Sequence, residues 1–103
     1  MESKPSLDSF GNKCWYDSVN KFELHRENDL PAVEYQNGSK SWYKNGVLHR
    51  ENGPAMIDTT MKIYSAHYYW FINGTQYNDY NINEMPLSSY FAYVKWKLNV
   101  NVT

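Results

Sequence analysis

The sequence predicts an all-β protein, built as an antiparallel meander of repeated β-hairpins. Three observations predict this class. Ten Tyr and four Trp bring the aromatic share to 17%, and aromatic side chains pack well on pleated sheets. Four of the five glycines directly follow an asparagine, and Asn-Gly pairs favour tight hairpin turns. Finally, the run Leu-His-Arg-Glu-Asn occurs at residues 24–28 and again at 48–52, so the turns belong to a repeated unit.

The length of 103 residues suits one domain with a single modest core. Residues 1–12 are mixed polar, with Pro5 and Gly11, and are predicted to form a loose N-terminal arm. Residues 13–103 are predicted to form one β-hairpin-repeat domain, with a C-terminal extension that begins at about residue 78.

The charge balance excludes some function classes. A formal net charge of −1 argues against a protein that binds duplex DNA, which usually carries a basic excess, and against an acidic DNA mimic. Cys14 is the only cysteine, so no internal disulfide or Cys-based metal site is expected, and a reducing compartment is predicted. The sequence shows neither a signal-peptide pattern nor a membrane-spanning apolar run, so we expect a cytoplasmic protein with no membrane partner.

Residues 42–55 are the clearest copy of the unit. If Asn45-Gly46 is a two-residue turn, Lys44 pairs with Val47, Tyr43 with Leu48 and Trp42 with His49. If the Asn37-Gly38 pair turns in the same way, Val33 lies opposite Trp42 and Tyr35 opposite Lys40. Pro31 and Pro54 are expected at strand starts, because proline cannot donate to a strand ladder.

The other copies depart from this one. Trp15 lies ten residues before His25, against seven from Trp42 to His49, so a longer hairpin loop is expected in the first copy. Asp29-Leu30 stands there where the second copy has Gly53. A third, partial copy begins at residues 70–74. Residues 63–72 are predicted to form one long strand or two with a bulge, and residues 73–86 an irregular segment.

The tail allows two interpretations. Ala92, Val94, Trp96 and Leu98 alternate with more polar residues, which favours a half-buried strand. The alternative is a short C-terminal helix from Ser88 or Ser89, which would stack apolar side chains on one face: Leu87, Phe91, Val94 and Leu98.

The unit resembles a repeat found in proteins of tailed bacteriophages and giant viruses, of the form Trp-Tyr-x-Asn-Gly-x-Leu-His-Arg-x-x-Gly-Pro-Ala. Residues 42–55 match it throughout, residues 22–33 match it with the Asp29-Leu30 departure, and residues 70–74 match its opening. It also looks like a distant relative of MORN repeats, whose β-hairpins stack into an extended sheet. The resemblance implies a viral accessory protein that acts on the host, and it implies no general enzymatic activity.

Two groups of side chains are candidates for binding a partner or ligand. The recurring pairs His25-Arg26 and His49-Arg50 have the chemistry of an anion or phosphate site. The structural interpretation is favoured, because residues that define a repeat usually build it. The aromatic residues exceed what a small core buries, so exposed Tyr and Trp are expected to anchor a partner, with Tyr43, Trp70, Tyr77 and Tyr80 as the candidates.

No catalytic residue, metal site or cofactor is predicted. The three histidines are 24 and 18 residues apart, which matches no compact ligand motif. No nucleophile elbow, phosphate loop or paired-carboxylate motif accompanies them.

The sequence therefore predicts a small non-enzymatic viral protein that binds and inhibits a host protein, for example a component of an antiviral defence system, in the host cytoplasm. The alternative is a binding module that sequesters a small anionic ligand such as a nucleotide signal. Homodimerisation through an exposed sheet edge is a further expectation.

Overall fold

The computed structural model describes residues 4–59 and 67–102. Its main layer is an antiparallel sheet of seven strands in the order β1-β2-β3-β4-β7-β8-β9, and a separate two-stranded sheet pairs β5 with β6. The strands are β1 (Ser6–Leu7), β2 (Lys13–Cys14), β3 (Val33–Glu34), β4 (Lys40–Ser41), β5 (Tyr43–Lys44), β6 (Val47–Leu48), β7 (Met56–Asp58), β8 (His67–Ile72) and β9 (Thr75–Tyr77).

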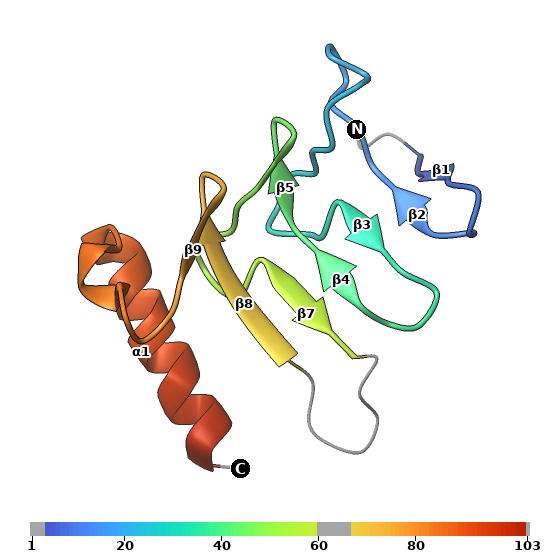
Figure 1. The fold of residues 1–103 in the computed structure, drawn as a ribbon. Coiled ribbons are helices and arrows are strands. Elements are labelled where there is room, and N and C mark those ends of the chain that lie inside the picture. Colours follow the sequence, from blue (N-terminus) through green and yellow to red (C-terminus); the bar gives the residue numbers. More distant parts are fainter. Residues whose placement is uncertain (1–3, 60–66, 103) are drawn as a thin grey trace.

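A short 3-10 helix, η1 (Ile82–Glu84), and one α-helix, α1 (Leu87–Val102), complete the chain. Helix α1 lies beside β8 and β9, at one end of the sheet (Figure 1). The prediction of an all-β antiparallel meander, with a short C-terminal helix as its stated alternative for the tail, is confirmed.

The hairpin turn of the central unit forms as predicted. Asn45 and Gly46 both adopt positive φ, at 51° and 85°, which is the geometry of a type I′ turn. Tyr43 pairs with Leu48, as expected, and the amide of His49 donates to the carbonyl of Trp42 at 3.0 Å.

The register at Asn37-Gly38 was predicted wrongly by one residue. Val33 pairs with Ser41, not with Trp42, and the amide of Tyr35 donates to the carbonyl of Ser39. Only Gly38 has positive φ in this turn, because the Asn37 side chain accepts the Ser39 amide at 2.8 Å and the loop takes a third residue. A three-residue loop shifts the pairing that a two-residue turn would give.

The first unit has the longer loop that its spacing predicts. Tyr16 bridges to Leu24, and the amide of Asp17 donates to the carbonyl of Glu23 at 2.9 Å. Residues 17–22 therefore form a loop that projects from the sheet (Figure 1). The segment before it contributes β1, which pairs with β2, where a loose arm was expected.

The third unit completes its hairpin. Asn73 and Gly74 form a second turn with positive φ at both residues, and Trp70 pairs with Tyr77. The prediction that residues 73–86 are irregular is therefore wrong for β9 and η1. The long strand predicted over 63–72 is present as His67–Ile72, and its residues 63–66 lie outside the described part of the chain.

The tail is a helix, so the favoured strand interpretation is wrong. Trp70 explains why, because its ring is 2% exposed only through the cover of this segment. Ala92, Tyr93 and Trp96 pack against the cluster that contains Trp70, and their spacing of three and four residues lies on one side of a helix. The local alternation is overridden by this tertiary packing.

Gly46→Ala tests the turn on which the register depends. The φ of 85° at this residue costs a side chain with a Cβ about 1–2 kcal/mol, so we expect a loss of that size in the free energy of unfolding, measured by urea denaturation. Lys44→Ala, at an exposed neighbour without positive φ, is the control and is expected to change stability little. Equal stability of Gly46→Ala and the wild type would contradict the type I′ geometry.

Candidate functional site

The arginine of the central unit is held inside the repeat. The Arg50 guanidinium lies over the Trp42 ring, with its central carbon 3.9 Å from the ring centroid. It donates to the carbonyl of Pro54 at 3.1 Å, and to both carboxylate oxygens of Asp29 at 2.9 and 3.2 Å. This stacked, bidentate arrangement uses the planar geometry that distinguishes Arg from Lys.

The first unit repeats the arrangement. The Arg26 guanidinium lies 3.7 Å from the centroid of the Trp15 ring, donates to the carbonyl of Pro31 at 3.1 Å, and forms an ion pair with Glu34 at 3.1 Å. Both arginines therefore join the first strand of a unit to the segment that leaves it.

The histidine of each unit receives the turn of the next. The amide of Asn45 donates to Nδ1 of His25 at 3.2 Å, and the amide of Gly46 donates to the carbonyl of Leu24 at 2.9 Å. These are the two residues with positive φ at the turn. The tip of the second hairpin is thereby bonded to the end of the first.

The same pair of bonds joins the second unit to the third. The amide of Asn73 donates to Nδ1 of His49 at 2.8 Å, and the amide of Gly74 donates to the carbonyl of Leu48 at 2.8 Å. An imidazole that accepts at Nδ1 carries its proton on Nε2 when neutral. In the first unit, Nε2 of His25 faces Glu27 at 2.7 Å.

Five of the eight residues predicted to bind a partner or ligand line one cleft between these units: His25, Arg26, Tyr43, His49 and Arg50. The cleft has a volume of about 240 Å³. Its charges are already paired, because the arginines bind Asp29 and Glu34, and exposed Glu27 and Glu51 add negative charge. This arrangement favours the structural interpretation of the His-Arg pairs over an anion site.

The extra residue of the first unit has a structural role. Asn28 and Asp29 adopt positive φ, and the carbonyl of Asp29 accepts the indole Nε1 of Trp42 at 2.9 Å. Trp70 follows the unit that lacks this residue, and its buried Nε1 has no hydrogen-bond partner within the described part of the chain. The Asp29-Leu30 departure therefore strengthens the join between the first two units.

The third unit departs from the other two, and the tail compensates. Tyr77 stands where the other units have His, and the ring of Trp70 is covered by the edges of Tyr93 and Trp96, at centroid distances of 5.3 and 5.8 Å. The side-chain amide of Asn81 donates to the carbonyl of Gln76 at 3.0 Å. Leu24 and Leu48 use this carbonyl to accept the next turn, so Asn81 ends the array.

The remaining predicted candidates lie at this end of the molecule. Trp70 and Tyr77 line a second cleft of about 380 Å³ between the last hairpin and helix α1, together with Tyr93 and Trp96. Trp70 is buried, Tyr77 is half-buried and Tyr80 is 96% exposed. The eight predicted residues therefore divide between two places and do not form one site.

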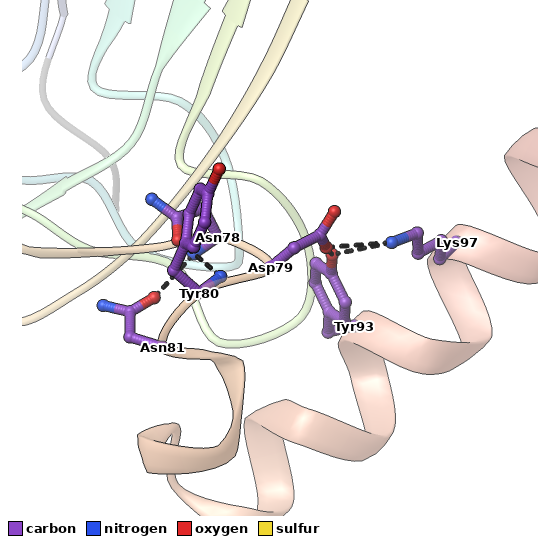
Figure 2. Close-up of polar contacts among 6 residues, drawn as sticks. All are labelled: Asn78, Asp79, Tyr80, Asn81, Tyr93 and Lys97. Atoms are coloured by element: carbon purple, nitrogen blue, oxygen red, sulfur yellow. Dashed lines mark hydrogen bonds and ion pairs between the residues drawn. The ribbon is translucent and has the colours of Figure 1, made fainter.

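An ion pair ties the helix to the loop at the rim of the second cleft. Figure 2 shows the Asp79 carboxylate between two side chains of successive turns of α1: Lys97 Nζ at 3.1 Å and the Tyr93 hydroxyl at 3.2 Å. The hydrogen bond from Lys97 is the main cause that lowers the pKa of Asp79, and the same bond raises the pKa of Lys97.

Two surfaces that the sequence did not identify expose large apolar side chains. In the 17–22 loop, Val19 is 90% exposed and Phe22 is 94% exposed. On helix α1, the face predicted to be apolar is the outer one: Leu87, Phe91, Val94 and Leu98 are among the exposed large hydrophobic residues. The packed face of the helix carries the aromatic residues instead.

The 17–22 loop is held by its own polar side chains. The Asp17 carboxylate accepts the amides of Val19 and Asn20 at 3.0 and 2.7 Å, and these bonds lower the pKa of Asp17. The Asn20 side chain accepts the amide of Phe22 at 3.3 Å. Both apolar side chains are thus presented from a loop whose backbone is fixed.

Other chemistry has little support in residues 4–59 and 67–102. They contain no cluster of three or more His, Cys, Asp or Glu placed to hold a metal ion. Cys14 is buried, and burial raises the pKa of its thiol, which disfavours the reactive thiolate. None of the helices among these residues has the length and apolar character that crossing a membrane requires.

Comparison with known proteins adds no assignment: the chain has no significant match among the models of protein families, the curated proteins or the solved structures.

Arg50→Lys separates the structural role of the arginine from anion binding. The substitution removes the planar contact with Trp42 and the bidentate pair with Asp29, so we expect a loss of roughly 1–2 kcal/mol in the free energy of unfolding. Asp29→Asn removes the ion pair but retains the backbone carbonyl, and is expected to cost less. Unchanged stability in Arg50→Lys would instead favour an arginine reserved for a ligand.

Asp79→Asn tests the tie between the helix and the last hairpin. A carboxyl whose pKa is lowered by folding stabilises the folded state above its unfolded pKa, near 3.8, and this contribution is lost as the pH falls through the folded pKa. We therefore expect the variant to be less stable than the wild type at pH 7, and the difference to shrink below pH 3.8.

The measurement is denaturant unfolding followed by tryptophan fluorescence, at several pH values. Asp8 and Asp17 also have lowered pKa values, so both proteins lose stability in acid and only their difference reports on Asp79. A difference that stays constant from pH 7 to acid would contradict a role for the ionised carboxylate.

Proposed function

We propose that this protein is a non-enzymatic binding protein that attaches to a host protein through the 17–22 loop and inhibits it. The observation that carries the proposal is the near-complete exposure of Val19 and Phe22, at 90% and 94%, on a loop fixed by internal hydrogen bonds. Large apolar side chains held in water contribute nothing to folding, and they are typical of anchors that insert into a partner.

The rigidity of the loop favours this role. Asp17 and Asn20 satisfy the loop amides within the loop itself, so little backbone entropy remains to be lost on binding. Full burial of a Val or Phe side chain contributes about 1.5–3 kcal/mol. Two such side chains suit an apolar pocket on a protein surface, where a small polar ligand would leave them exposed.

The resemblance of residues 42–55 to repeats of bacteriophage and giant-virus proteins supports the choice of a host protein as partner. A component of an antiviral defence system is the expected class. The alternative, capture of a small anionic ligand, has less support because Arg26 and Arg50 already bind carboxylates of this chain.

The double substitution Val19→Ser/Phe22→Ser tests the proposal. Tagged wild-type protein is expected to retain a stoichiometric partner from host lysate, and the double variant is expected to lose it, because the partner's pocket is no longer filled. Tyr80→Ser is the matched control, since Tyr80 is 96% exposed at the other end of the molecule, and it is expected to retain the partner.

Circular dichroism must show that all three proteins fold. Two results would count against the proposal: no stoichiometric partner for the wild type, or equal recovery of the partner by the loop variant. Inhibition is then checked by adding the purified protein to the recovered partner and measuring the partner's own activity.

A further inference from the structure

Helix α1 has the composition of a helix that is covered on two sides. Its inner face places Tyr93 and Trp96 against Trp70, with Ser89 buried at 2% exposure. Its outer face presents Leu87, Phe91, Val94 and Leu98, exposed at 68, 64, 37 and 62%. A helix that is apolar around its circumference is normally buried on both faces, and here the sheet covers one of them.

The outer residues are spaced for contact with another helix. Leu87, Phe91, Val94 and Leu98 follow one another at intervals of four, three and four residues, which is the spacing of the seam between two packed helices. The described length of α1, 16 residues, gives a seam of about 24 Å at 1.5 Å per residue. These four side chains are called the outer seam below.

We infer that the outer seam is covered by the outer seam of a second copy of this chain, in an antiparallel, two-fold arrangement. The order Leu, Phe, Val, Leu suits this pairing. With the axis between Phe91 and Val94, each Phe91 packs on Val94 of the second copy, and each Leu87 packs on Leu98. Large side chains meet small ones at the centre, and the contact is the same on both chains, as a two-fold interface requires.

The charges on the helix favour the antiparallel direction. Helix α1 carries Lys95 and Lys97 and no acidic residue. Parallel helices would place each lysine level with its own copy. Antiparallel helices place Lys95 level with Tyr90 of the second copy, where the ring can accept the ammonium group. The charge of Lys97 is already compensated by Asp79 at 3.1 Å.

The end of the array leaves the helix as the available surface on this side. Asn81 occupies the Gln76 carbonyl that would receive a further hairpin, so strand addition through this bond is blocked. A single helix pair buries less than the roughly 800 Å² per partner of a standard interface. The dimer is therefore expected to be weak and to depend on concentration.

Sedimentation equilibrium of the whole chain tests the inference, from about 10 µM to about 1 mM, the range that a weak interface requires. The wild-type mass is expected to rise from 12.2 kDa toward twice that value. Phe91→Glu is expected to remain monomeric, because it buries a charge in the seam. Phe22→Glu changes an equally apolar, exposed residue elsewhere and is the control that retains association.

A compensating variant tests the direction. Phe91→Glu/Val94→Lys places opposite charges against each other only when the helices are antiparallel, so it is expected to restore the dimer that Phe91→Glu loses. Parallel helices would set Glu against Glu and Lys against Lys, and the double variant would stay monomeric.

Three results would overturn the inference: a wild type that is monomeric throughout, association that survives Phe91→Glu, or a double variant that stays monomeric. A monomeric wild type that instead co-sediments with phosphatidylserine vesicles would assign the outer seam to a membrane surface. The loop variant of the preceding section keeps the seam intact, so failure of the dimer and failure of host-protein binding are distinguishable.

Discussion

The fold depends on one contact, the pair of hydrogen bonds between the tip of each hairpin and the end of the hairpin before it. The two amides at a type I′ turn point outward and need acceptors. The preceding unit supplies them as the carbonyl of a leucine and Nδ1 of a histidine, for Asn45-Gly46 as for Asn73-Gly74. Because both acceptors belong to the Leu-His-Arg run, the repeated sequence is the means by which one unit recognises the next. The arginine then closes its own unit by lying over the tryptophan.

An array built in this way presents an unused acceptor pair at its last unit, and the tail disposes of it. Tyr77 replaces the histidine, Asn81 occupies the carbonyl of Gln76, and Tyr93 and Trp96 cover the ring that no arginine covers. Terminal units of repeat proteins need such caps, because an uncovered end exposes the internal face of the array. Helix α1 is thus a consequence of the repeat, although its sequence contains no copy of it. The cap uses one face of the helix and leaves the outer seam exposed.

Sequence reasoning succeeded where the determining contacts are local. The Asn45-Gly46 turn fixed its own register, and the interpretation of His49 and Arg50 as structural agrees with their bonds to Asn73 and Asp29. It failed at Asn37-Gly38, where the Asn37 side chain binds Ser39 and lengthens the loop. It also failed in the tail, where the need to cover Trp70 outweighed a clean alternation. The exposure of Val19 and Phe22 was not predictable from composition, because it depends on the absence of a unit before the first one that could cover the loop.

The units and the segments outside them therefore divide the work of the chain. Within the units, the side chains with the most chemistry are used internally: the histidines accept turn amides and the arginines bind carboxylates of the same chain. What these contacts leave for an external partner is apolar, and it lies in the 17–22 loop and on the outer face of α1. Exposed apolar surface of this extent is costly to keep in water and contributes nothing to the array. Two separate apolar surfaces at opposite ends of a small, rigid sheet fit a protein that binds one partner at the loop while its helix holds a second copy. In such a pair, two loops act together, so modest affinity at each loop yields tighter binding to any target that presents two sites.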